Sequence, residues 1–434
     1  MMELNKSEVN QYDTAVIGGG LAGLIAAIDL AKGGQSVVIF EKSGRLGGRA
    51  KTNKKNGAFL NLGGHALYRA GQAHAILAEL GVRLDGGNPP SKMNAMWNNR
   101  IVPMPANLSS MLTSKLLKWP SKIQLIQLVM KLAKMDANRI PDMSLRAWAE
   151  AEMPDPMVRH IFYSLCRTAT YAQDPDYQLA GIVLAQVKRS LKGVLYLHGG
   201  WQTIVDQLKD KAIQAGVQIV NGKDVKEILL ENGKVQKVRL ADGEEVRASN
   251  VISTASPSET YKLVSDAADR TLLKQWKDQA RPSMAACLDL GLRKLPERGR
   301  DFVMGLDQPI FFSHHTVNAR LSDNGIRVVH LVKYNGPGES DPKADERLMI
   351  DVMNTLHPGW EQEVVARQFM PNITVVHDTL HIGRTIRFTG PAVEGVPGLY
   401  VAGDWVTHGE MLADASAASA KRAAAAILKN SRMA

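Results

Sequence analysis

The sequence predicts a mixed α/β protein, with one domain built on a parallel central sheet and a second, mixed α+β domain that includes a helical insert. Three observations support this fold class. The first 50 residues alternate strand, helix and strand patterns; residues 89–195 have helical spacing of their apolar positions; and the strand–helix alternation returns after residue 199. Since the early and late segments share one pattern, we expect two domains, each assembled from discontinuous sequence.

The N-terminal elements form a β-α-β unit. Residues 14–17 are a short apolar strand, and residues 21–32 have the apolar spacing of a helix that stops at Gly33-Gly34. Residues 36–40 form a second strand that ends at Glu41. This order implies two parallel strands joined by a crossover helix.

The later elements follow from the same kinds of pattern. Residues 112–135 are mostly helical, with an interruption at Pro120, and residues 204–215 form a helix that ends at Gly216. The turn dipeptides Asn232-Gly233 and Asp242-Gly243 separate short strands. The other expected elements are strands at 217–220, 225–230, 234–240, 245–248, 251–253, 284–290, 326–332, 374–377 and 399–402, and helices at 346–355 and 413–426.

Composition excludes several classes of protein. Of the 434 residues, 45% are hydrophobic and 22% charged, as in an ordinary globular protein, and two cysteines cannot build a disulfide framework. The net charge of +10 fits an anionic partner (nucleic acid, a membrane surface or an anionic ligand) or a generally basic surface. No apolar run approaches the length of a membrane span and residues 1–12 lack an apolar signal core, so we expect a cytoplasmic protein.

The glycine-rich residues 18–23 fit the dinucleotide pattern G-x-G-x-x-G, directly after a strand and at the start of a helix. Gly18 permits the tight turn, Gly20 lets the backbone approach a pyrophosphate, and Gly23 lets the helix pack closely on the strand. The helix N-terminus offers N–H groups to phosphates. Glu41 stands at the end of the next strand, where it can accept hydrogen bonds from ribose hydroxyls. These residues predict a Rossmann-type dinucleotide-binding domain.

A second motif narrows the choice of cofactor. Residues 45–52 read R-L-G-G-R-A-K-T and resemble the loop that follows the ribose-binding acid in the superfamily of flavin-containing amine oxidases, protoporphyrinogen oxidases and phytoene (carotenoid) desaturases. The resemblance implies that the cofactor is FAD and that Arg49 approaches its pyrophosphate. Gly47 and Gly48 allow a close backbone approach there.

A third motif, at residues 398–405, resembles the superfamily's second FAD motif. The resemblance implies that Asp404 binds a ribityl hydroxyl and that the N-terminus of the Ala-rich helix points at the flavin pyrimidine ring. Weaker matches are residues 198–201, Val225 at the adenine and the loop 62–65 near the flavin. The cofactor-binding residues implied in this way are Gly18, Gly20, Leu21, Ala22, Gly23, Glu41, Lys42, Gly48, Arg49, Gly63, Gly64, His65, Val225, Gly403, Asp404, Met411 and Leu412.

The resemblance also implies a division of the chain. We expect an FAD-binding domain of residues 11–85, 196–265 and 390–434, and a substrate-binding domain of residues 86–195 and 266–389. His65 and Trp405 are the candidate catalytic residues. His65 is equally well explained as a packing residue of its loop, and Trp405 as a core residue.

Departures from the superfamily pattern bear on the reaction. Amine-oxidising members carry a lysine on a substrate-domain strand, and the comparable residues 283–288 contain none. The turn after Gly403-Asp404 also lacks the aromatic residue that often completes a cage. We therefore expect a desaturase or dehydrogenase that moves hydride from a hydrophobic, terpenoid-, carotenoid- or porphyrinogen-like substrate to flavin N5. An amine or amino-acid oxidase that produces hydrogen peroxide is one alternative, and a flavin-dependent isomerase or a non-catalytic FAD-binding protein is another.

The helical insert suggests a further partner. Residues 112–135 carry five lysines among Leu, Ile, Met and Trp119, which is typical of a basic amphipathic helix that lies on an anionic membrane, and equally of a solvated lysine face. His377 and His381 lack the glutamate of a metalloprotease motif, and the adjacent His314 and His315 cannot share one face. We predict no metal site. Because basic residues are dispersed and no reading motif is present, we also predict no nucleic-acid partner.

Overall fold

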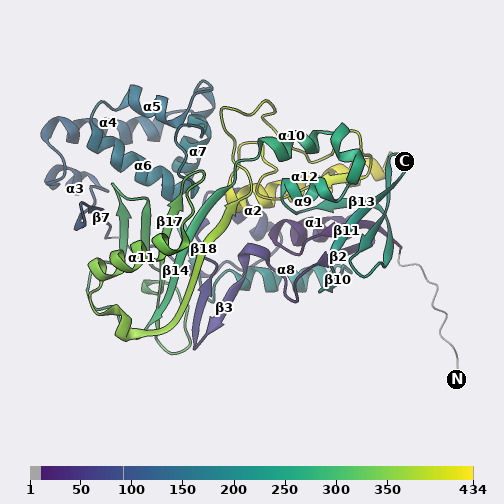
Figure 1. Cartoon of the computed structure of the whole chain (residues 1–434), viewed down its shortest axis with the longest axis horizontal. Coiled ribbons are helices and arrows are strands. Elements are labelled where there is room, and N and C mark those ends of the chain that lie inside the picture. Colours follow the sequence, from purple (N-terminus) through teal and green to yellow (C-terminus); the bar gives the residue numbers. More distant parts are fainter. Residues whose placement is uncertain (1–10, 91, 434) are drawn as a thin grey trace. The chain divides into compact units, whose positions relative to one another are not determined.

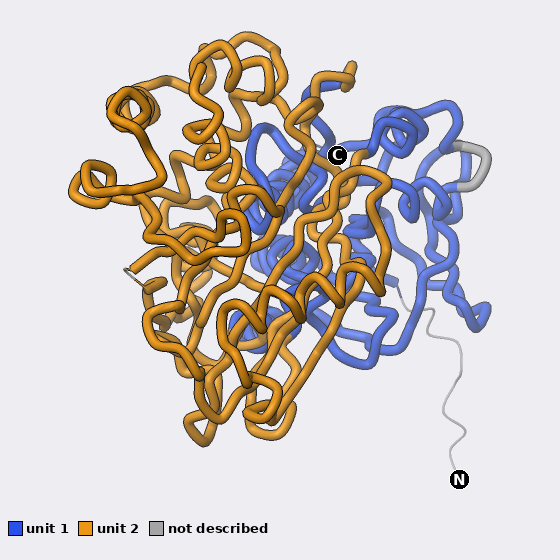
Figure 2. The backbone as a smooth tube through the Cα atoms, turned by 60° about the vertical axis from the view of Figure 1, so that its left-hand side comes forward, with its two compact units in different colours: residues 1–51, 204–280, 386–434 blue, residues 52–203, 281–385 orange. Residues whose placement is uncertain are grey.

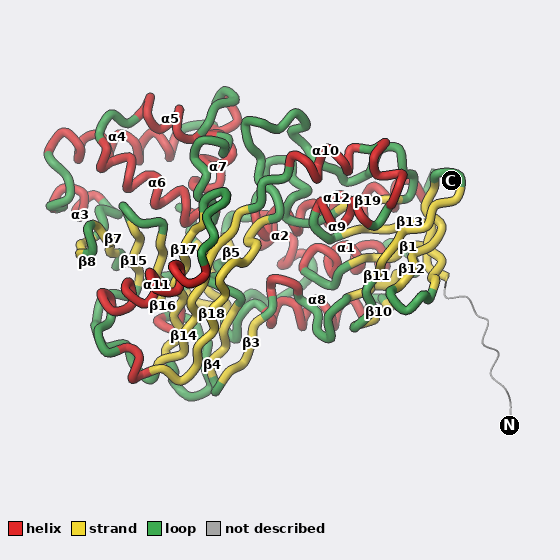
Figure 3. Tube along the Cα trace, viewed as in Figure 1, coloured by secondary structure: helices red, strands yellow, loops and turns green. Residues whose placement is uncertain are grey.

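The computed structural model describes residues 11–90 and 92–433, and its Cα trace divides into two compact units of discontinuous sequence (Figure 2). Unit 1 comprises residues 1–51, 204–280 and 386–434, and unit 2 comprises residues 52–203 and 281–385. The two sheets and their helices are shown in Figure 1 and Figure 3. The mixed α/β class predicted from the sequence is confirmed.

Unit 1 is built on a seven-stranded sheet with the order β10-β2-β1-β13-β12-β11, in which β19 also pairs with β13. Its strands are β1 Gln11–Ile17, β2 Val37–Glu41, β10 Gln218–Asn221, β11 Val225–Glu231, β12 Lys234–Leu240, β13 Glu245–Ser253 and β19 Leu399–Val401. The pairs β10–β2, β2–β1, β1–β13 and β13–β19 are parallel, whereas β12 is antiparallel to both its neighbours. Every residue of β2 is buried, as expected for a parallel strand covered on both faces.

Two helices from opposite ends of the sequence pack together in unit 1. The helices of this unit are α1 Leu21–Lys32, α8 Gln202–Gln214, α9 Pro257–Lys262, α10 Leu272–Gln279 and α12 Leu412–Ser431, with the short 3₁₀ turns η1 Gly48–Ala50 and η3 Ser265–Arg270. α1 contacts α12, and a Cβ atom on Gly33 would lie 2.4 Å from Leu428 Cδ2. Lys421 Nζ on α12 forms an ion pair with Asp29 Oδ2 on α1 at 2.8 Å. The C-terminal helix therefore covers the first β-α-β unit.

Unit 2 contains a second seven-stranded sheet, with the order β18-β14-β17-β16-β15-β7-β8. All neighbours are antiparallel except β15 and β7. The strands of unit 2 are β3 Thr52–Lys55, β4 Ala58–Asn61, β5 Leu67–Tyr68, β6 Gly86–Gly87, β7 Asn94–Trp97, β8 Arg100–Pro103, β9 Val194–Leu197, β14 Ser283–Leu292, β15 Phe302–Gly305, β16 Ile310–His314, β17 Arg327–Asn335 and β18 Val364–Val376. β3 and β4 form a hairpin, and β5, β9 and β6 form a small separate sheet.

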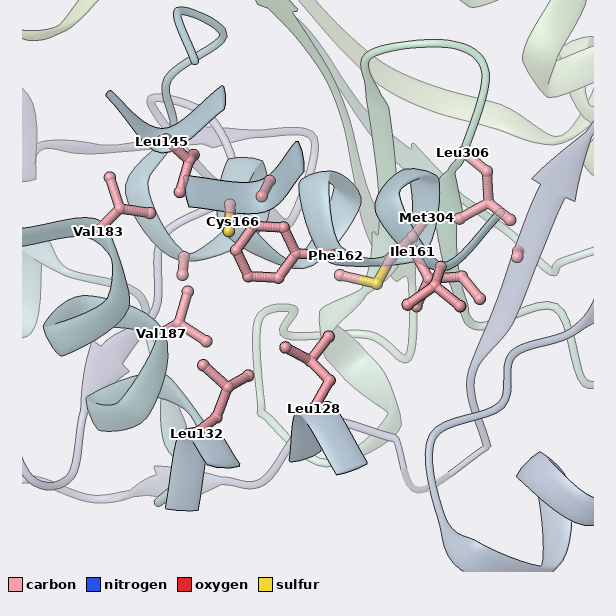
Figure 4. Packing of buried hydrophobic residues seen from close by; sticks show 14 of the residues in the cluster. Leu128, Leu132, Leu145, Ile161, Phe162, Cys166, Val183, Val187, Met304 and Leu306 are labelled. Carbon is pink, nitrogen blue, oxygen red and sulfur yellow. The ribbon is translucent and has the colours of Figure 1, made fainter. Parts of the chain in front are cut away.

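The helical insert of unit 2 has its own hydrophobic core. The helices of unit 2 are α2 Gln72–Glu79, α3 Leu108–Thr113, α4 Trp119–Lys134, α5 Leu145–Glu152, α6 Pro156–Thr170, α7 Ala180–Ser190 and α11 Pro342–Leu356, with the 3₁₀ turns η2 Ala137–Arg139, η4 His315–Val317 and η5 Trp360–Glu363. Leu128 and Leu132 of α4 join Phe162 of α6 and Val187 of α7 in one buried cluster (Figure 4). Apolar spacing at three and four residues thus gives each helix one buried face.

Some expected elements differ from the observed ones. Pro120 does not interrupt a helix but lies in the first turn of α4, where a missing backbone N–H costs nothing. The expectation of helix throughout residues 89–195 missed the hairpin β7–β8, whose turn is Asn98-Asn99 with φ of 49° and 56°. Asparagine tolerates this left-handed conformation, which a two-residue hairpin requires. β18 ends at Val376, so His377 and His381 do not lie on a strand.

The two units also have boundaries that differ from those of the expected domains. Residues 52–85 and 196–203 belong to unit 2, and residues 266–280 and 386–389 to unit 1. The reason for the first difference is that the hairpin β3–β4 is bonded to other segments of unit 2: Asn56 Nδ2 donates to Val365 O of β18 at 2.8 Å, and Phe59 N donates to Leu321 O at 2.9 Å. The functional assignment of each domain stays a prediction.

Burial of one histidine predicts a dependence of stability on pH. His357 follows α11, is 0% exposed and accepts a hydrogen bond at Nδ1 from Glu297 N at 3.3 Å. Burial lowers the pKa of His357 from 6.5 to about 4. Between these values the unfolded chain binds a proton that the folded protein does not, so the free energy of unfolding falls as the pH is lowered from 6.5 to 4.

We expect His357→Gln to remove about 2–3 kcal/mol of this fall, because glutamine does not titrate and its amide oxygen can accept from Glu297. Chemical denaturation at pH 7 and pH 4.5 measures the effect. His408→Gln, at an exposed position, is the control and should leave the fall unchanged. An identical fall in wild type and His357→Gln would contradict the prediction.

Candidate functional site

The glycine turn of unit 1 is packed so tightly that two of its residues have no room for a side chain. Gly18, directly after β1, has φ of +103°, and a Cβ atom there would lie 2.3 Å from Thr254 Oγ1. A Cβ atom on Gly23 would lie 2.0 Å from Gly18 O. Thr254 Oγ1 itself donates to Ile17 O at 2.8 Å. The turn therefore holds the first turn of α1 against the end of β1.

The N-terminus of α1 has the properties of an anion site. Its N-cap residue is Gly20, no described side chain caps it, and its first turn contains no acidic residue. The first N–H groups of an α-helix have no partner within the helix, and here Leu21 and Ala22 are 8% and 5% exposed. A Cβ atom on Gly20 would meet no atom within 4 Å, in contrast to Gly18 and Gly23.

The loop 45–49 lies beside this helix end. Gly47 N donates to Gly19 O at 2.9 Å, and a Cβ atom on Gly48 would meet only Gly20 Cα, at 3.6 Å. Neither Gly20 nor Gly48 therefore has a side-chain atom of another residue close to its Cβ position, and both lie next to the uncapped N–H groups of α1. This arrangement fits the pyrophosphate of a dinucleotide, because the phosphates can approach the backbone there.

Glu41 lies at the end of a strand, as predicted, and it also accepts hydrogen bonds from the glycine turn, which the sequence pattern did not indicate. It ends β2 and is 7% exposed. Its Oε2 accepts from Gly19 N at 2.8 Å, and its Oε1 accepts from Ser43 N and Ser43 Oγ at 2.9 and 2.7 Å. A carboxylate has about four acceptor positions, so these bonds leave room for a ribose hydroxyl. Glu41 therefore also holds the glycine turn in place.

The segment before β11 lies next to Glu41. Gly222 N donates to Ser43 O, and Lys223 N donates to Glu41 O, both at 3.1 Å. Val225, the first residue of β11, follows directly and is 5% exposed. The structure thus joins the segment that leads into Val225, the predicted adenine-contacting residue, to the segment of Glu41, the predicted ribose-binding residue.

Arg49 and Asp404 form an ion pair although 355 positions separate them in the sequence. Arg49 Nη1 lies 2.9 Å from Asp404 Oδ2, and Arg49 Nη2 lies 2.5 Å from Asp404 Oδ1. The Asp404 side chain is 4% exposed and that of Arg49 is 40% exposed. This two-point geometry is the strongest form of an arginine–carboxylate contact. The predicted pyrophosphate ligand and the predicted ribityl ligand are therefore neighbours.

Contacts from α12 determine the position of the Gly403-Asp404 turn. Gly403 has φ of +146°, its N–H donates to Ser419 Oγ at 2.9 Å, and Ser419 Oγ contacts Gly403 O at 3.1 Å. Met411 is the N-cap of α12 and is 5% exposed, and Leu412 has φ of +59°. Unlike α1, this helix has an acid, Asp414, in its first turn.

Trp405 lies in the core of unit 1. Its side chain is 0% exposed, its Nε1 donates to Ala255 O at 2.9 Å, and its ring meets that of Trp276 edge-on at 5.8 Å. Of the two roles that the sequence left open for Trp405, this placement supports the packing role.

The remaining predicted cofactor residues lie apart from the glycine turn, either in unit 2 or at the surface. Gly63, Gly64 and His65 belong to unit 2, where His65 is half-buried and its ring meets that of Trp201 edge-on at 5.3 Å. Lys42 is exposed. Sequence reasoning missed Thr254 and Ser419, which hold the two FAD motifs. Ser419 is a polar residue within the Ala-rich helix and could have been noticed for that reason.

A parallel sheet, a glycine turn at an uncapped helix N-terminus and an acid at the end of the next strand define a dinucleotide-binding protein. The profile of the family described as "Flavin containing amine oxidoreductase" matches residues 21–286, more than half of the chain. The chain belongs to this family of flavin-containing proteins. The family and the cofactor predicted from the resemblance are confirmed.

Two curated relatives and one solved structure illustrate the similarity. The chloroplastic prolycopene isomerase of Daucus carota is 24% identical over 58% of this chain and 47% of its own length. Protoporphyrinogen oxidase 2 of Arabidopsis thaliana is 32% identical over 34% of this chain and 28% of its own length. The matches thus span about half or less of these relatives. An oxidoreductase from Methanosarcina mazei has the same fold, with a TM-score of 0.76, 22% identity and coverage of 94% of this chain and 99% of that one.

None of the helices within residues 11–90 and 92–433 combines the length and the apolar character that crossing a membrane requires. In the same residues, no group of three or more His, Cys, Asp or Glu side chains could hold a metal ion.

Proposed function

We propose that this protein is a desaturase or dehydrogenase that oxidises a hydrophobic substrate of terpenoid, carotenoid or porphyrinogen type. The residues proposed to hold FAD are Glu41 and Val225 at the adenosine, Gly20 and Arg49 at the pyrophosphate, and Asp404 at the ribityl chain. The chemistry that FAD supplies when bound is acceptance of a hydride at N5 and return of two electrons to oxygen, a quinone or another acceptor. The substrate loses a hydride and a proton and gains a double bond.

The observation that carries this choice of substrate is the composition of β14. This strand has no lysine, and its one charged residue, Asp289, is 0% exposed and bonded to other side chains of unit 2. Residues Ala285 to Leu288 are all buried and apolar. A strand of this kind supplies no amine to hold a water molecule for amine oxidation. It suits a substrate without polar groups at the reacting carbon.

Two alternatives follow from the comparisons. The family includes amine-oxidising members, which favours an amine or amino-acid oxidase, and the relative from Daucus carota favours an isomerase that uses flavin without net oxidation. Anaerobic photometry of the purified holoprotein against amines, carotenoid precursors and porphyrinogens distinguishes them. Bleaching of the flavin by a carotenoid precursor or porphyrinogen supports the proposal. Bleaching by amines alone supports the oxidase, and isomerised product without oxidised product supports the isomerase.

We also propose that the protein works in the cytoplasm at a membrane surface, because its substrates partition into lipid. The exposed apolar residues of α4 support this proposal: Trp119, Ile123 and Met130 are 66%, 55% and 54% exposed and share one face with Ile126. Leu108 and Leu112 of α3 are 61% and 41% exposed. The opposite face of α4 packs into the core of the insert (Figure 4). We call the exposed residues Leu108, Leu112, Trp119, Ile123 and Met130 the apolar stripe.

The charge around the apolar stripe fits an anionic lipid surface. Residues 100–134 contain six basic residues, Arg100, Lys115, Lys118, Lys122, Lys131 and Lys134, and no acidic residue. Lys122 Nζ lies 4.9 Å from the centroid of the Trp119 ring. Lys122 is buried and donates to Leu112 O, and Lys131 pairs with Glu152, whereas Lys115, Lys118 and Lys134 are exposed. Exposed apolar side chains accompanied by exposed lysines are typical of a helix that lies in the interface of a bilayer.

Vesicle flotation tests this contact. We expect the protein to float with vesicles of 70% neutral and 30% anionic lipid, and to bind purely neutral vesicles at least about tenfold more weakly, because each lysine near an anionic surface contributes about 1 kcal/mol. Trp119→Ala/Ile123→Ala should reduce flotation about tenfold or more, since both side chains leave the lipid. Leu191→Ala/Ile213→Ala, at 57% and 52% exposed positions elsewhere, is the matched control. Flotation unaffected by the first pair would contradict the proposal.

A further inference from the structure

The hairpin β7–β8 of unit 2 (Figure 3) carries a cavity that none of the predicted cofactor residues lines. Its volume is about 470 Å³, and it is lined by Trp97, Asn98, Arg100 and Val102. Pockets that hold small molecules have volumes of roughly 300–1,000 Å³. The cavity is therefore large enough for a small polar group with an apolar neighbour, and its lining offers both a cation and an aromatic wall.

The hairpin turn that forms part of this lining is held by the turn between β15 and β16. Asn98 N donates to Asp307 Oδ2 at 2.8 Å, and Gln308 Nε2 donates to Asn99 Oδ1 at 3.1 Å. These bonds order the hairpin turn in the absence of any ligand. A site that is ordered in advance loses less conformational entropy when it binds.

The strand register places the side chains of the cavity on one face of the sheet. Trp97 pairs with Arg100, and Ala95 pairs with Val102. Because side chains alternate between the two faces of a sheet, these four share a face, and Met96 lies on the other. Ala95 belongs to the core of the helical insert, against which Trp97 and Val102 pack, whereas Met96 belongs to the core under α11. The cavity therefore lies on the insert side of the sheet.

Arg100 brings a positive charge to the cavity. It is exposed, and no residue within 11–90 and 92–433 forms a hydrogen bond or an ion pair with its guanidinium. Trp97, opposite Arg100, is half-buried, and its ring meets that of His160 of α6 edge-on at 5.0 Å. A guanidinium binds phosphate oxygens through two parallel N–H groups, and an indole adds an apolar wall.

The surroundings of the cavity favour the phosphate of a lipid over a free anion. Arg100 is the first residue of the segment 100–134, which contains six basic residues and no acidic one. Residues 104–107 connect β8 to α3, where the apolar stripe begins, and Met104 and Met111 share one buried cluster with Ala95. Tryptophan and arginine together are typical of a protein surface at the level of lipid headgroups.

We propose that the cavity at Trp97 and Arg100 binds the phosphate of an anionic phospholipid headgroup. Arg100 donates hydrogen bonds to the phosphate oxygens, and the Trp97 ring packs against the glycerol. The proposal rests on the membrane contact proposed above and adds a headgroup site to it. In this arrangement the apolar stripe enters the lipid, while the hairpin holds one headgroup and thereby fixes how unit 2 lies on the surface.

The indole N–H signal of Trp97 reports on this site without a membrane. The holoprotein is labelled with ¹⁵N in tryptophan, and the signal is assigned through Trp97→Phe. Dihexanoyl phosphatidylglycerol, kept below the concentration at which it forms micelles, should shift this signal saturably. Arg100→Gln should weaken the binding about tenfold or more, because the two-point contact is lost. Asp307→Asn, which keeps an acceptor for Asn98 N and removes a negative charge, should tighten it.

Two variants control for charge alone. Lys134→Gln removes a positive charge from the insert outside the cavity, and Arg347→Gln removes an exposed guanidinium from α11, on the other side of the sheet. Both should leave the binding unchanged. An unmoved Trp97 signal, full affinity in Arg100→Gln, or equal weakening in either control would overturn the site. Inorganic phosphate is titrated in parallel, and binding as tight as that of the phospholipid would overturn the lipid as its ligand.

The outcome for the headgroup site can be told apart from the outcome for the membrane contact. If the monomeric phospholipid shifts the Trp97 signal while the wild-type protein does not float with anionic vesicles, the headgroup site stands and the membrane contact fails. If the protein floats through its apolar stripe and the phospholipid leaves the Trp97 signal unmoved, the membrane contact stands and the headgroup site is wrong.

Discussion

Gly20→Ala is expected to reduce the affinity for FAD on the order of 100-fold, which corresponds to about 3 kcal/mol, while the cofactor-free protein loses less than about 1 kcal/mol of stability. The new methyl group would meet no protein atom within 4 Å, and the backbone φ of −82° is allowed for alanine. It would, however, stand at the uncapped N-terminus of α1, where the pyrophosphate is proposed to approach. Titration of cofactor-free protein with FAD and chemical denaturation measure the two effects.

Gly23→Ala, in the same turn, shows what a loss of folding stability does to FAD binding, for comparison with Gly20→Ala. Gly23→Ala places a Cβ atom 2.0 Å from Gly18 O, so α1 must move away from β1 and both stability and FAD binding should fall. Gly44→Ala is the matched control: Gly44 lies in the exposed loop after β2, and a Cβ atom there meets nothing within 4 Å. Normal FAD affinity in Gly20→Ala would show that the cofactor does not approach this helix end.

Arg49→Ala should lower the free energy of unfolding by about 2–3 kcal/mol and weaken FAD retention about tenfold or more. The substitution removes the two-point ion pair from the carboxylate of Asp404, which is 4% exposed. The expected loss of unfolding free energy is not larger, because the Arg49 side chain is 40% exposed and water can hydrate Asp404 when the arginine is removed. Denaturation curves and the ratio of released flavin to protein measure the two losses.

A double-mutant cycle with Asp404→Ala isolates the pair. The double variant should lose less stability than the sum of the single variants by about 2 kcal/mol, because either single change already breaks the contact. Arg247→Ala, which removes an exposed guanidinium from the same unit, should cost less than about 0.5 kcal/mol. Additive losses in the cycle, or full flavin content in Arg49→Ala, would contradict the role given to Arg49.

The first β-α-β unit could be predicted closely because its signals are local. Strand β1 is apolar and ends at a glycine turn, α1 stops at Gly33-Gly34, and Glu41 ends the next strand as predicted. Parallel connectivity then brings residues 18–23 and Glu41 together without further information. The hairpin β7–β8 was missed because its turn, Asn98-Asn99, lies within a segment dominated by helical spacing.

The sequence by itself determined the glycine turn, its acid and, through resemblance, the cofactor, because neighbouring residues along the chain set these features. Tertiary structure decided that Arg49 contacts Asp404, that Ser419 holds Gly403, that Trp405 is a core residue and that the loop 62–65 belongs to unit 2. Each of these depends on segments that lie far apart in sequence. Their meeting depends on sheet register and helix packing, which no local pattern encodes.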